Sequence, residues 1–131
     1  MECLSDDQLT YTPREGLRPL GEIFCHIASN EEGWFRYCVT HQIDGWDEAD
    51  FRLEDYPSIP AIRLLLAEVH ERTLTLLTHD TQLVLKQEIT LPWGPVISVE
   101  GVVWHVLEHE IHHRGEIYLM LGLLGIEAPD V

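Results

Sequence analysis

Basic side chains are scarce in this sequence: eight Lys and Arg stand against 23 Asp and Glu, which gives a formal net charge of -15. Such an acidic chain repels the phosphates of nucleic acids and anionic membrane surfaces, so we expect neither as a partner. No apolar run approaches the ~20 residues of a transmembrane helix, and the start of the chain lacks the basic and apolar regions of a secretory signal. These absences predict a cytoplasmic location.

Cysteine is also rare. Cys3, Cys25 and Cys38 are odd in number and form no C-x-x-C motif, which favours reduced thiols over a disulfide framework. The sequence has no internal repeat and no Gly/Ser-rich linker, and its 131 residues suit one compact unit. We therefore expect a single domain over residues 1–131.

Hydrophobic periodicity predicts an all-α protein with three long helices. The expected helices span about residues 18–39, 58–79 and 99–124, the last of them capped by Ser98. On the first helix, Glu31 and Glu32 fall on the polar side. Before the last helix, the segment LVLKQEITLPWGPVIS places β-branched residues around a Pro-Trp-Gly-Pro turn, which predicts a short hairpin or an extended loop.

Histidine is abundant, with eight in the chain and four of them in residues 105–113. At about 100° per residue, these four share one sector of the last predicted helix with Glu116. Buried imidazoles without partners cost free energy, so the stripe either faces water or shares a partner. A metal ion would be such a partner, because His109 and His113 at i, i+4 spacing can hold Zn, Ni, Cu or Fe at about 2.0–2.1 Å.

A third ligand must come from another helix. His26 is the best candidate, because it lies among Ile23, Phe24 and Ile27 on the face that the first helix should bury. Three histidines plus water would form an open site of the catalytic type. The remaining polar residues expected around the ligands or in the adjoining pocket are His105, Asn30, Glu110 and Glu116. For the isolated His41, His70 and His79 we expect surface or capping roles, and for His70 a position facing the pocket is the alternative.

The same segment contains HEIHH, which formally matches the H-E-x-x-H of zinc peptidases with Glu110 as general base. A zinc peptidase needs a further ligand downstream, yet only 18 residues follow His113, and Glu116 stands where metzincins have glycine. A peptidase is therefore disfavoured. A di-iron carboxylate site is disfavoured as well, since the sequence has no second E-x-x-H.

Two segments, LGEIFCHIASNEEGW (residues 20–34) and WHVLEHEIHHRGEIY (residues 104–118), resemble the DinB/YfiT-like superfamily of metal-binding four-helix bundles. The resemblance extends over about residues 9–129. In that family one histidine comes from an early helix and two come from an H-x3-H on a late helix, which match His26, His109 and His113. Family activities include transfer or isomerisation with low-molecular-weight thiols such as bacillithiol or mycothiol.

The sequence departs from the family in one respect. Members usually carry a full helix before the segment that matches residues 9–13, whereas only eight residues precede Leu9 here. Three helices would leave an apolar groove open, which favours association into a homodimer. Gly115, in the middle of the last helix, suggests close approach of another helix at that point.

These observations predict a small cytoplasmic metalloprotein with a divalent ion, zinc or nickel, bound by three histidines. The resemblance implies metal-dependent thiol transfer or hydrolysis on a small molecule, with a low-molecular-weight thiol as one substrate class. The alternative is a non-enzymatic metal- or ligand-binding helical module. Because histidines bind metals in their neutral form, we expect metal affinity to fall as the pH drops through about 6.

Overall fold

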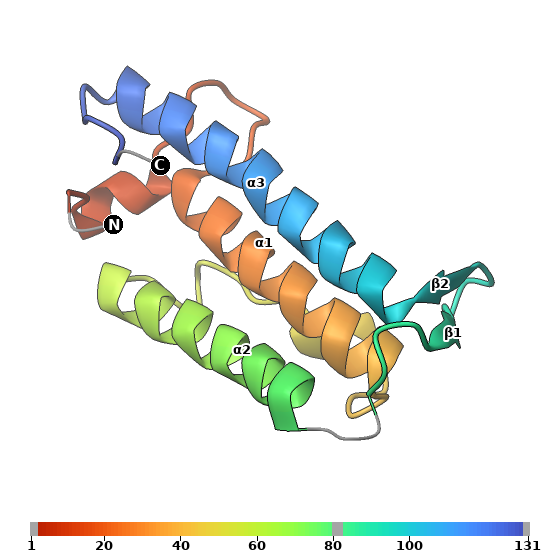
Figure 1. The fold of residues 1–131 in the computed structure, drawn as a ribbon. Coiled ribbons are helices and arrows are strands. Elements are labelled where there is room, and N and C mark those ends of the chain that lie inside the picture. The colour runs from red at the N-terminus through yellow and green to blue at the C-terminus, as the bar shows by residue number, and fades with distance from the viewer. Residues whose placement is uncertain (1–2, 80–82, 130–131) are drawn as a thin grey trace.

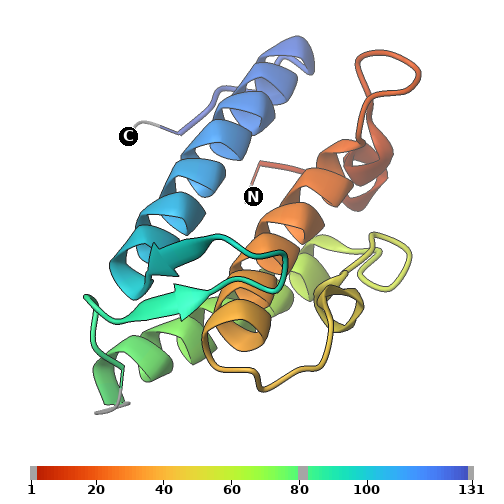
Figure 2. The same ribbon diagram turned by 90° about the vertical axis from the view of Figure 1, so that its right-hand side faces the viewer.

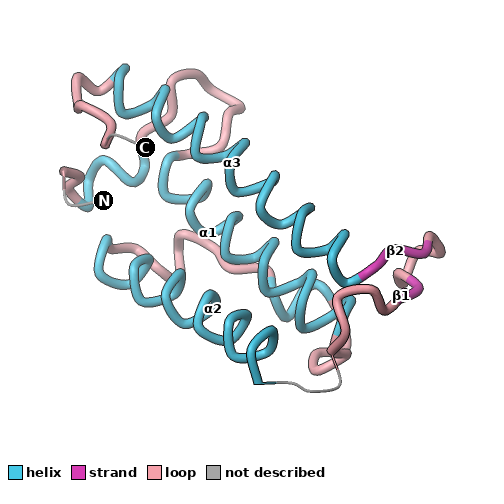
Figure 3. The backbone as a smooth tube through the Cα atoms, in the orientation of Figure 1, coloured by secondary structure: helices cyan, strands magenta, loops and turns pink. Residues whose placement is uncertain are grey.

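Three long helices form the body of the protein in the computed structural model, which describes residues 3–79 and 83–129. α1 lies between α2 and α3 and packs against both (Figures 1 and 3). A short antiparallel hairpin of β1 and β2, in which Ile89 pairs with Ile97, precedes α3. It covers one end of the pair formed by α1 and α3 (Figure 2). The predicted all-α fold with a hairpin before the last helix is confirmed. The elements are α1 (Leu20–Glu32), α2 (Ile59–His79), β1 (Glu88–Thr90), β2 (Val96–Ser98) and α3 (Val99–Leu123).

The ends of α3 follow from local sequence signals. The Ser98 side chain accepts a hydrogen bond from the backbone N–H of Gly101 at 3.0 Å, which satisfies one of the free donors of the first turn. Gly125 follows the helix with φ of +74°, a conformation that glycine adopts without strain. The predicted bounds of the last helix therefore agree with the structure to within one residue.

The first helix differs from the prediction in its second half. Regular α geometry ends at Glu32, and the chain continues as the π-helical segment η2 (Gly33–Val39). A Cβ at Gly33 would lie 2.7 Å from the indole of Trp46, which belongs to the short 3-10 helix η3 (Trp46–Ala49). Only glycine allows this close approach. Periodicity over two turns does not separate an α-helix from a π-helix, so the sequence did not predict the change.

The placement of two acidic residues on the polar side of the first helix is wrong. Glu31 and Glu32 are both buried. Glu32 accepts hydrogen bonds from Arg36, one turn later, at 2.7 Å and from Arg72 of α2 at 3.1 Å. A buried carboxylate is tolerated when charged donors surround it, and these two arginines supply them.

The apolar core has two parts. The larger part joins all three helices with η1 (Asp6–Thr10), whose Leu9 is buried against them. The smaller part lies at the hairpin end and contains Trp34, Phe35, Cys38, Leu91 and Val102. Since residues from η2, the hairpin turn and α3 meet in this second cluster, it holds the hairpin against the end of the α1–α3 pair.

An apolar groove of about 440 Å³ lies between α2 and α3. In the described part of the chain before α1, the 3-10 helix η1 is the only helical element. Apolar lining residues come from all three helices and include Phe24, Ile27, Leu66, Ile117 and Leu121.

The expected close contact at Gly115 is not found within the described chain, where no neighbouring atom lies within 4 Å of the Cβ position. The glycine lies on an exposed side of α3, so no helix of this chain explains it. Over the same described residues, no helix is long and apolar enough to cross a membrane.

Candidate metal centre

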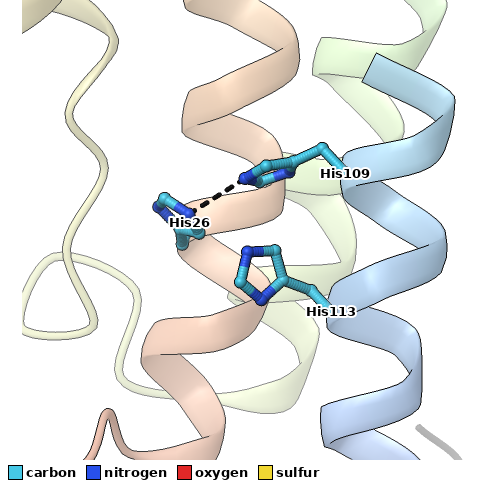
Figure 4. Close-up of side chains that lie close together, drawn as sticks. All are labelled: His26, His109 and His113. Atoms are coloured by element: carbon cyan, nitrogen blue, oxygen red, sulfur yellow. Dashed lines mark hydrogen bonds between the residues drawn. The ribbon is translucent and has the colours of Figure 1, made fainter. Parts of the chain in front are cut away.

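Three histidines that are far apart in the sequence meet in the seam between α1 and α3. His26 projects from α1 toward His109 and His113 of α3 (Figure 4). One ligand nitrogen from each of the three lies within 4.8 Å of the other two. The i, i+4 spacing stacks the two α3 side chains on one face, and packing of α3 on α1 brings His26 opposite them.

The geometry of this cluster suits one shared ion. Nε2 of His26 and Nε2 of His109 are 3.1 Å apart. Two nitrogens bound to a tetrahedral ion at about 2.05 Å are roughly 3.3 Å apart, so a small outward movement would admit a metal. The ring of His113 stands edge-on to His26, with centroids 4.8 Å apart, and its outer nitrogen faces the other two imidazoles (Figure 4).

Glu116 orients His113. The carboxylate Oε2 of Glu116 lies 2.7 Å from Nδ1 of His113, so it can accept a hydrogen bond from a protonated Nδ1. This tautomer leaves Nε2 of His113 free as a ligand atom, as in carboxylate–histidine–metal arrangements. Burial acts to raise the pKa of Glu116, but the hydrogen bond with His113 and the nearby charges of His113 and His112 outweigh it and lower that pKa. The carboxylate is thus ionised at neutral pH.

The electrostatic surroundings keep two ligand candidates neutral. Burial, followed by repulsion from Arg18 and His113, lowers the pKa of His26 to about 4. Burial, followed by repulsion from His113 and His26, lowers the pKa of His109 to about 4. A metal ion binds the neutral imidazole, so both residues are ready to bind at neutral pH without releasing a proton.

Two further residues expected near the centre are His105, which borders the cluster, and Asn30, which is on the His26 side of α1 by helical spacing. The His105 ring is 6.5 Å from that of His109 and 4.4 Å from that of Trp34, so it lies beside the cluster and away from its middle. Asn30 is one turn beyond His26 on α1. Its Oδ1 is buried and has no hydrogen-bond partner among the described residues.

The structure places Glu110 elsewhere. This side chain lines the apolar groove between α2 and α3, which none of the three clustered histidines lines. The H-E-x-x-H pattern therefore supplies two members of the cluster, while its glutamate belongs to a different surface. His70 also lines the groove, and its Nδ1 lies 3.2 Å from Oε1 of Glu31. His41 is exposed and follows η2 with a φ of 52°, whereas the side chain of His79 lies outside the described part of the structure.

Cys25, next to His26, is a packing residue. Its side chain is 0% exposed. Burial, reinforced by the negative charges of Glu22 and Asp55, raises the pKa of the Cys25 thiol to about 11. Thiolate is the nucleophilic form, so this cysteine is inert at neutral pH.

Sequence reasoning missed an aromatic cluster beside the metal centre. Trp34 of η2, Trp46 of η3 and Trp93 of the hairpin turn have ring centroids 5.7–6.4 Å from one another. The Pro-Trp-Gly-Pro turn indicated a hairpin, but nothing in the local sequence shows which surface its tryptophan would meet. The cluster extends the site from the histidines toward the hairpin.

The fold and the site together define a helical protein with a half-buried cluster of three histidines between two core helices. The sequence profile of the DinB superfamily matches residues 1–117, and the chain belongs to this superfamily.

Relatives and solved structures agree with this assignment. The chain is 23% identical over 126 residues to the uncharacterized protein YjoA of Bacillus subtilis, covering 95% of this chain and 79% of that protein. It is 25% identical over 118 residues to the uncharacterized protein YizA of the same organism, covering 87% and 70%. The crystal structure of a DinB-like protein from Bacillus cereus is similar in fold, with a TM-score of 0.70 and 18% identity over 99% of this chain and 84% of that one.

Proposed function

We propose that this protein is a small cytoplasmic metalloenzyme that holds a divalent ion, zinc or nickel, through His26, His109 and His113. It would transfer a low-molecular-weight thiol to, or hydrolyse, a small molecule. The observation that carries the proposal is the meeting of three imidazoles from two helices, two of them with pKa values lowered to about 4. Three nitrogen ligands leave coordination positions open for water or a thiolate.

The donor set favours zinc or nickel. Imidazole is a borderline ligand that suits these ions, whereas magnesium and calcium prefer oxygen. A divalent ion here would supply Lewis acidity, which lowers the pKa of a bound thiol or water. The chain's own part is to keep His26 and His109 neutral by burial and to fix the His113 tautomer through Glu116.

A non-enzymatic role is the second candidate. The cluster joins α1 to α3, so an ion there would cross-link two helices that contact each other over a shorter stretch than α1 and α2 do. A metal that binds only the folded state stabilises that state by mass action. This alternative predicts a metal-dependent melting temperature without any turnover.

Elemental analysis of untagged protein is the first test, because an affinity tag of histidines would bind metal itself. We expect about one zinc or nickel ion per chain. The metal-loaded and chelator-treated forms are then assayed with thiol-plus-electrophile pairs and with simple esters and amides. Turnover that is lost with chelator and restored by the ion supports the enzyme. A chelator-sensitive melting temperature without turnover supports the structural role, and protein without bound metal contradicts both.

We also propose that the protein forms a homodimer through the groove between α2 and α3. The groove exposes apolar side chains from three helices, and burial stabilises by roughly 25 cal/mol per Å². The net charge of -15 opposes self-association, but repulsion between separated surface charges is screened beyond about 8 Å at physiological salt. Light scattering at micromolar concentration would give a mass above 15.1 kDa if the dimer forms.

A further inference from the structure

A strip of polar and aromatic side chains leads from the metal centre along the seam between α1 and α3. After His26, the α1 side continues with Asn30 and Trp34. Before His109, the α3 side has His105. We propose that this strip binds an elongated small molecule with a metal-binding head, a hydrogen-bond donor and a planar apolar group. The proposal rests on the proposed metal centre and names the class of ligand that this centre would take.

The two sides of the strip run in opposite directions along the chain. His26 faces His109, with their Nε2 atoms 3.1 Å apart. Eight residues later, Trp34 contacts His105, which precedes His109 by one turn. Residue numbers thus rise along α1 while they fall along α3, and the same seam extends from the histidine cluster to the tryptophans.

Asn30 supplies the hydrogen-bond acceptor of the strip. Its position, four residues from both His26 and Trp34, places it between the two ends on the same side of the helix. The buried Oδ1 of Asn30 accepts no hydrogen bond within the described chain, and a buried acceptor without a partner costs free energy. A ligand N–H or O–H lying along the strip would supply the missing donor.

The three tryptophans at one end of the strip pack on one another and form an aromatic surface. Trp34 is only 8% exposed and stands edge-on to both Trp46 and Trp93, so the three rings brace one another. Trp93 nevertheless remains 55% exposed, and His105, which packs on Trp34, is exposed too. A planar apolar group could stack on these exposed rings and remove them from water.

Helix geometry sets the length of the ligand. At 1.5 Å per residue, Asn30 lies about 6 Å from His26 along the axis of α1, and Trp34, in the first turn of the π-helical segment η2, lies about 11 Å from it. The ligand therefore carries its donor about 6 Å and its planar group about 10–12 Å from the metal-binding head. A ring attached directly to the head would be too short to reach the tryptophans.

Three hydroxamates of graded composition test this arrangement on the zinc-loaded protein by calorimetry. Heptanohydroxamate has the metal-binding head and an alkyl tail. 7-Phenylheptanohydroxamate adds the ring about 10 Å from the head. 5-Benzamidopentanohydroxamate places its ring at the same distance but replaces part of the tail with an amide whose N–H donor lies about 6 Å from the head. We expect the ring to tighten binding about tenfold and the amide to tighten it several-fold further. Equal affinities for the three probes would overturn the proposal.

Single substitutions show which residue produces each increase in affinity. Trp93→Ala should abolish the advantage of the ring, whereas Trp104→Ala should preserve it, because Trp104 is similarly exposed, at 61%, but lies on the opposite side of α3 from the histidines. Asn30→Leu, which keeps the approximate shape, should abolish the advantage of the amide. Zinc content and melting temperature are measured for each variant to show that centre and fold persist. A ring advantage that survives in Trp93→Ala would contradict the assignment.

5-Benzamidopentanamide, which lacks the hydroxamate, separates the strip from the metal centre. If the wild-type protein binds no zinc but 5-benzamidopentanamide binds and is weakened by Asn30→Leu, the strip is supported while the proposed centre fails. If zinc binds and the three hydroxamates do not differ, the centre is supported while the strip fails. Absence of both zinc and 5-benzamidopentanamide binding would overturn both proposals.

Discussion

The pair formed by α1 and α3 has two very different sides. On one side His26, His109 and His113 meet, and burial lowers the pKa of the first two. On the other side the same helices present Phe24 and Ile117 to the groove beside α2. At 100° per residue, Phe24 lies about 160° around α1 from His26, whereas Ile117 lies only about 40° around α3 from His113, so a small angle on α3 separates two kinds of chemistry. One side is a cluster of imidazoles, whereas the other is a largely apolar groove.

The groove side is not wholly apolar. Glu31 and His70 pair across it at 3.2 Å, and Glu110 and Arg114 of α3 also line it. Charged residues around an apolar floor are typical of protein interaction surfaces. The comparison explains why Glu110, although it is adjacent to His109 in the sequence, takes no part in the histidine cluster.

The largest effect is expected when a single ligand histidine is removed, because the protein should then lose its metal ion. His26→Ala, His109→Ala or His113→Ala should each reduce metal content from about one ion per chain to none, because two remaining imidazoles hold an ion weakly. Elemental analysis after dialysis measures this. His41→Ala, which changes an exposed histidine, is the control and should keep full occupancy, and we expect the same of His79→Ala. Full occupancy in any of the three ligand variants would remove that residue from the site.

The second-largest effect is expected from acid, which should weaken metal binding by the three histidines. Protons compete for His26 and His109 only near their lowered pKa of about 4, so the loss of affinity that comes from these two ligands should be steepest there. With two protons competing, each pH unit below this range costs up to about a hundredfold. Zinc titrations between pH 4 and 7 measure the curve. A hundredfold loss between pH 7 and 6 would contradict the role of burial.

The same lowered pKa values predict how metal-free protein responds to acid. In the unfolded chain these histidines take up protons below about pH 6.5, whereas the folded state resists protonation until about pH 4. The contribution of these two histidines to the free energy of unfolding is complete above pH 6.5 and decreases as the pH falls toward 4. Thermal melts of metal-free protein across this range should show a falling midpoint, and a midpoint that rises would contradict the sign.

A smaller change is expected for Glu116→Gln. The amide loses the negative charge that favours a protonated Nδ1 on His113, although it preserves the size of the side chain. Loss of such a partner lowers metal affinity by about 10- to 100-fold. Competition with a chelator of known affinity measures the change. Glu110→Gln, on the groove side, is the matched control, and an equal loss in both variants would contradict the proposed role of Glu116.

The smallest effect is expected for a substitution in the groove between α2 and α3. Leu66→Ala removes apolar surface from the groove, and at about 1.4 kcal/mol per factor of ten it should weaken the proposed dimer by roughly tenfold. Leu64→Ala is the control, since Leu64 is 60% exposed and does not line the groove. Sedimentation at several concentrations compares the two. A wild-type protein that remains at 15.1 kDa throughout would contradict the dimer.

Much of the fold was predictable because its signals are local. Ser98 and Gly125 mark the ends of α3 through backbone chemistry that depends on a few neighbours. The stacking of His109 and His113 follows from helical periodicity alone, and the apolar neighbours of His26 indicated the face that turns inward. The sequence could therefore predict which histidines would meet before the helices were placed.

The remaining features depend on contacts between distant segments. Close packing of Trp46 on Gly33 accompanies the change from α- to π-helix, and Arg72 of α2 helps to bury Glu32. The approach of Trp93 to Trp34 extends the site toward the hairpin. By itself, the sequence determined the three helices, the ends of α3 and the histidine face, because these depend on residues a few positions apart. Only the tertiary structure decided what each face meets, because packing sets the partners of a side chain and periodicity sets only its direction.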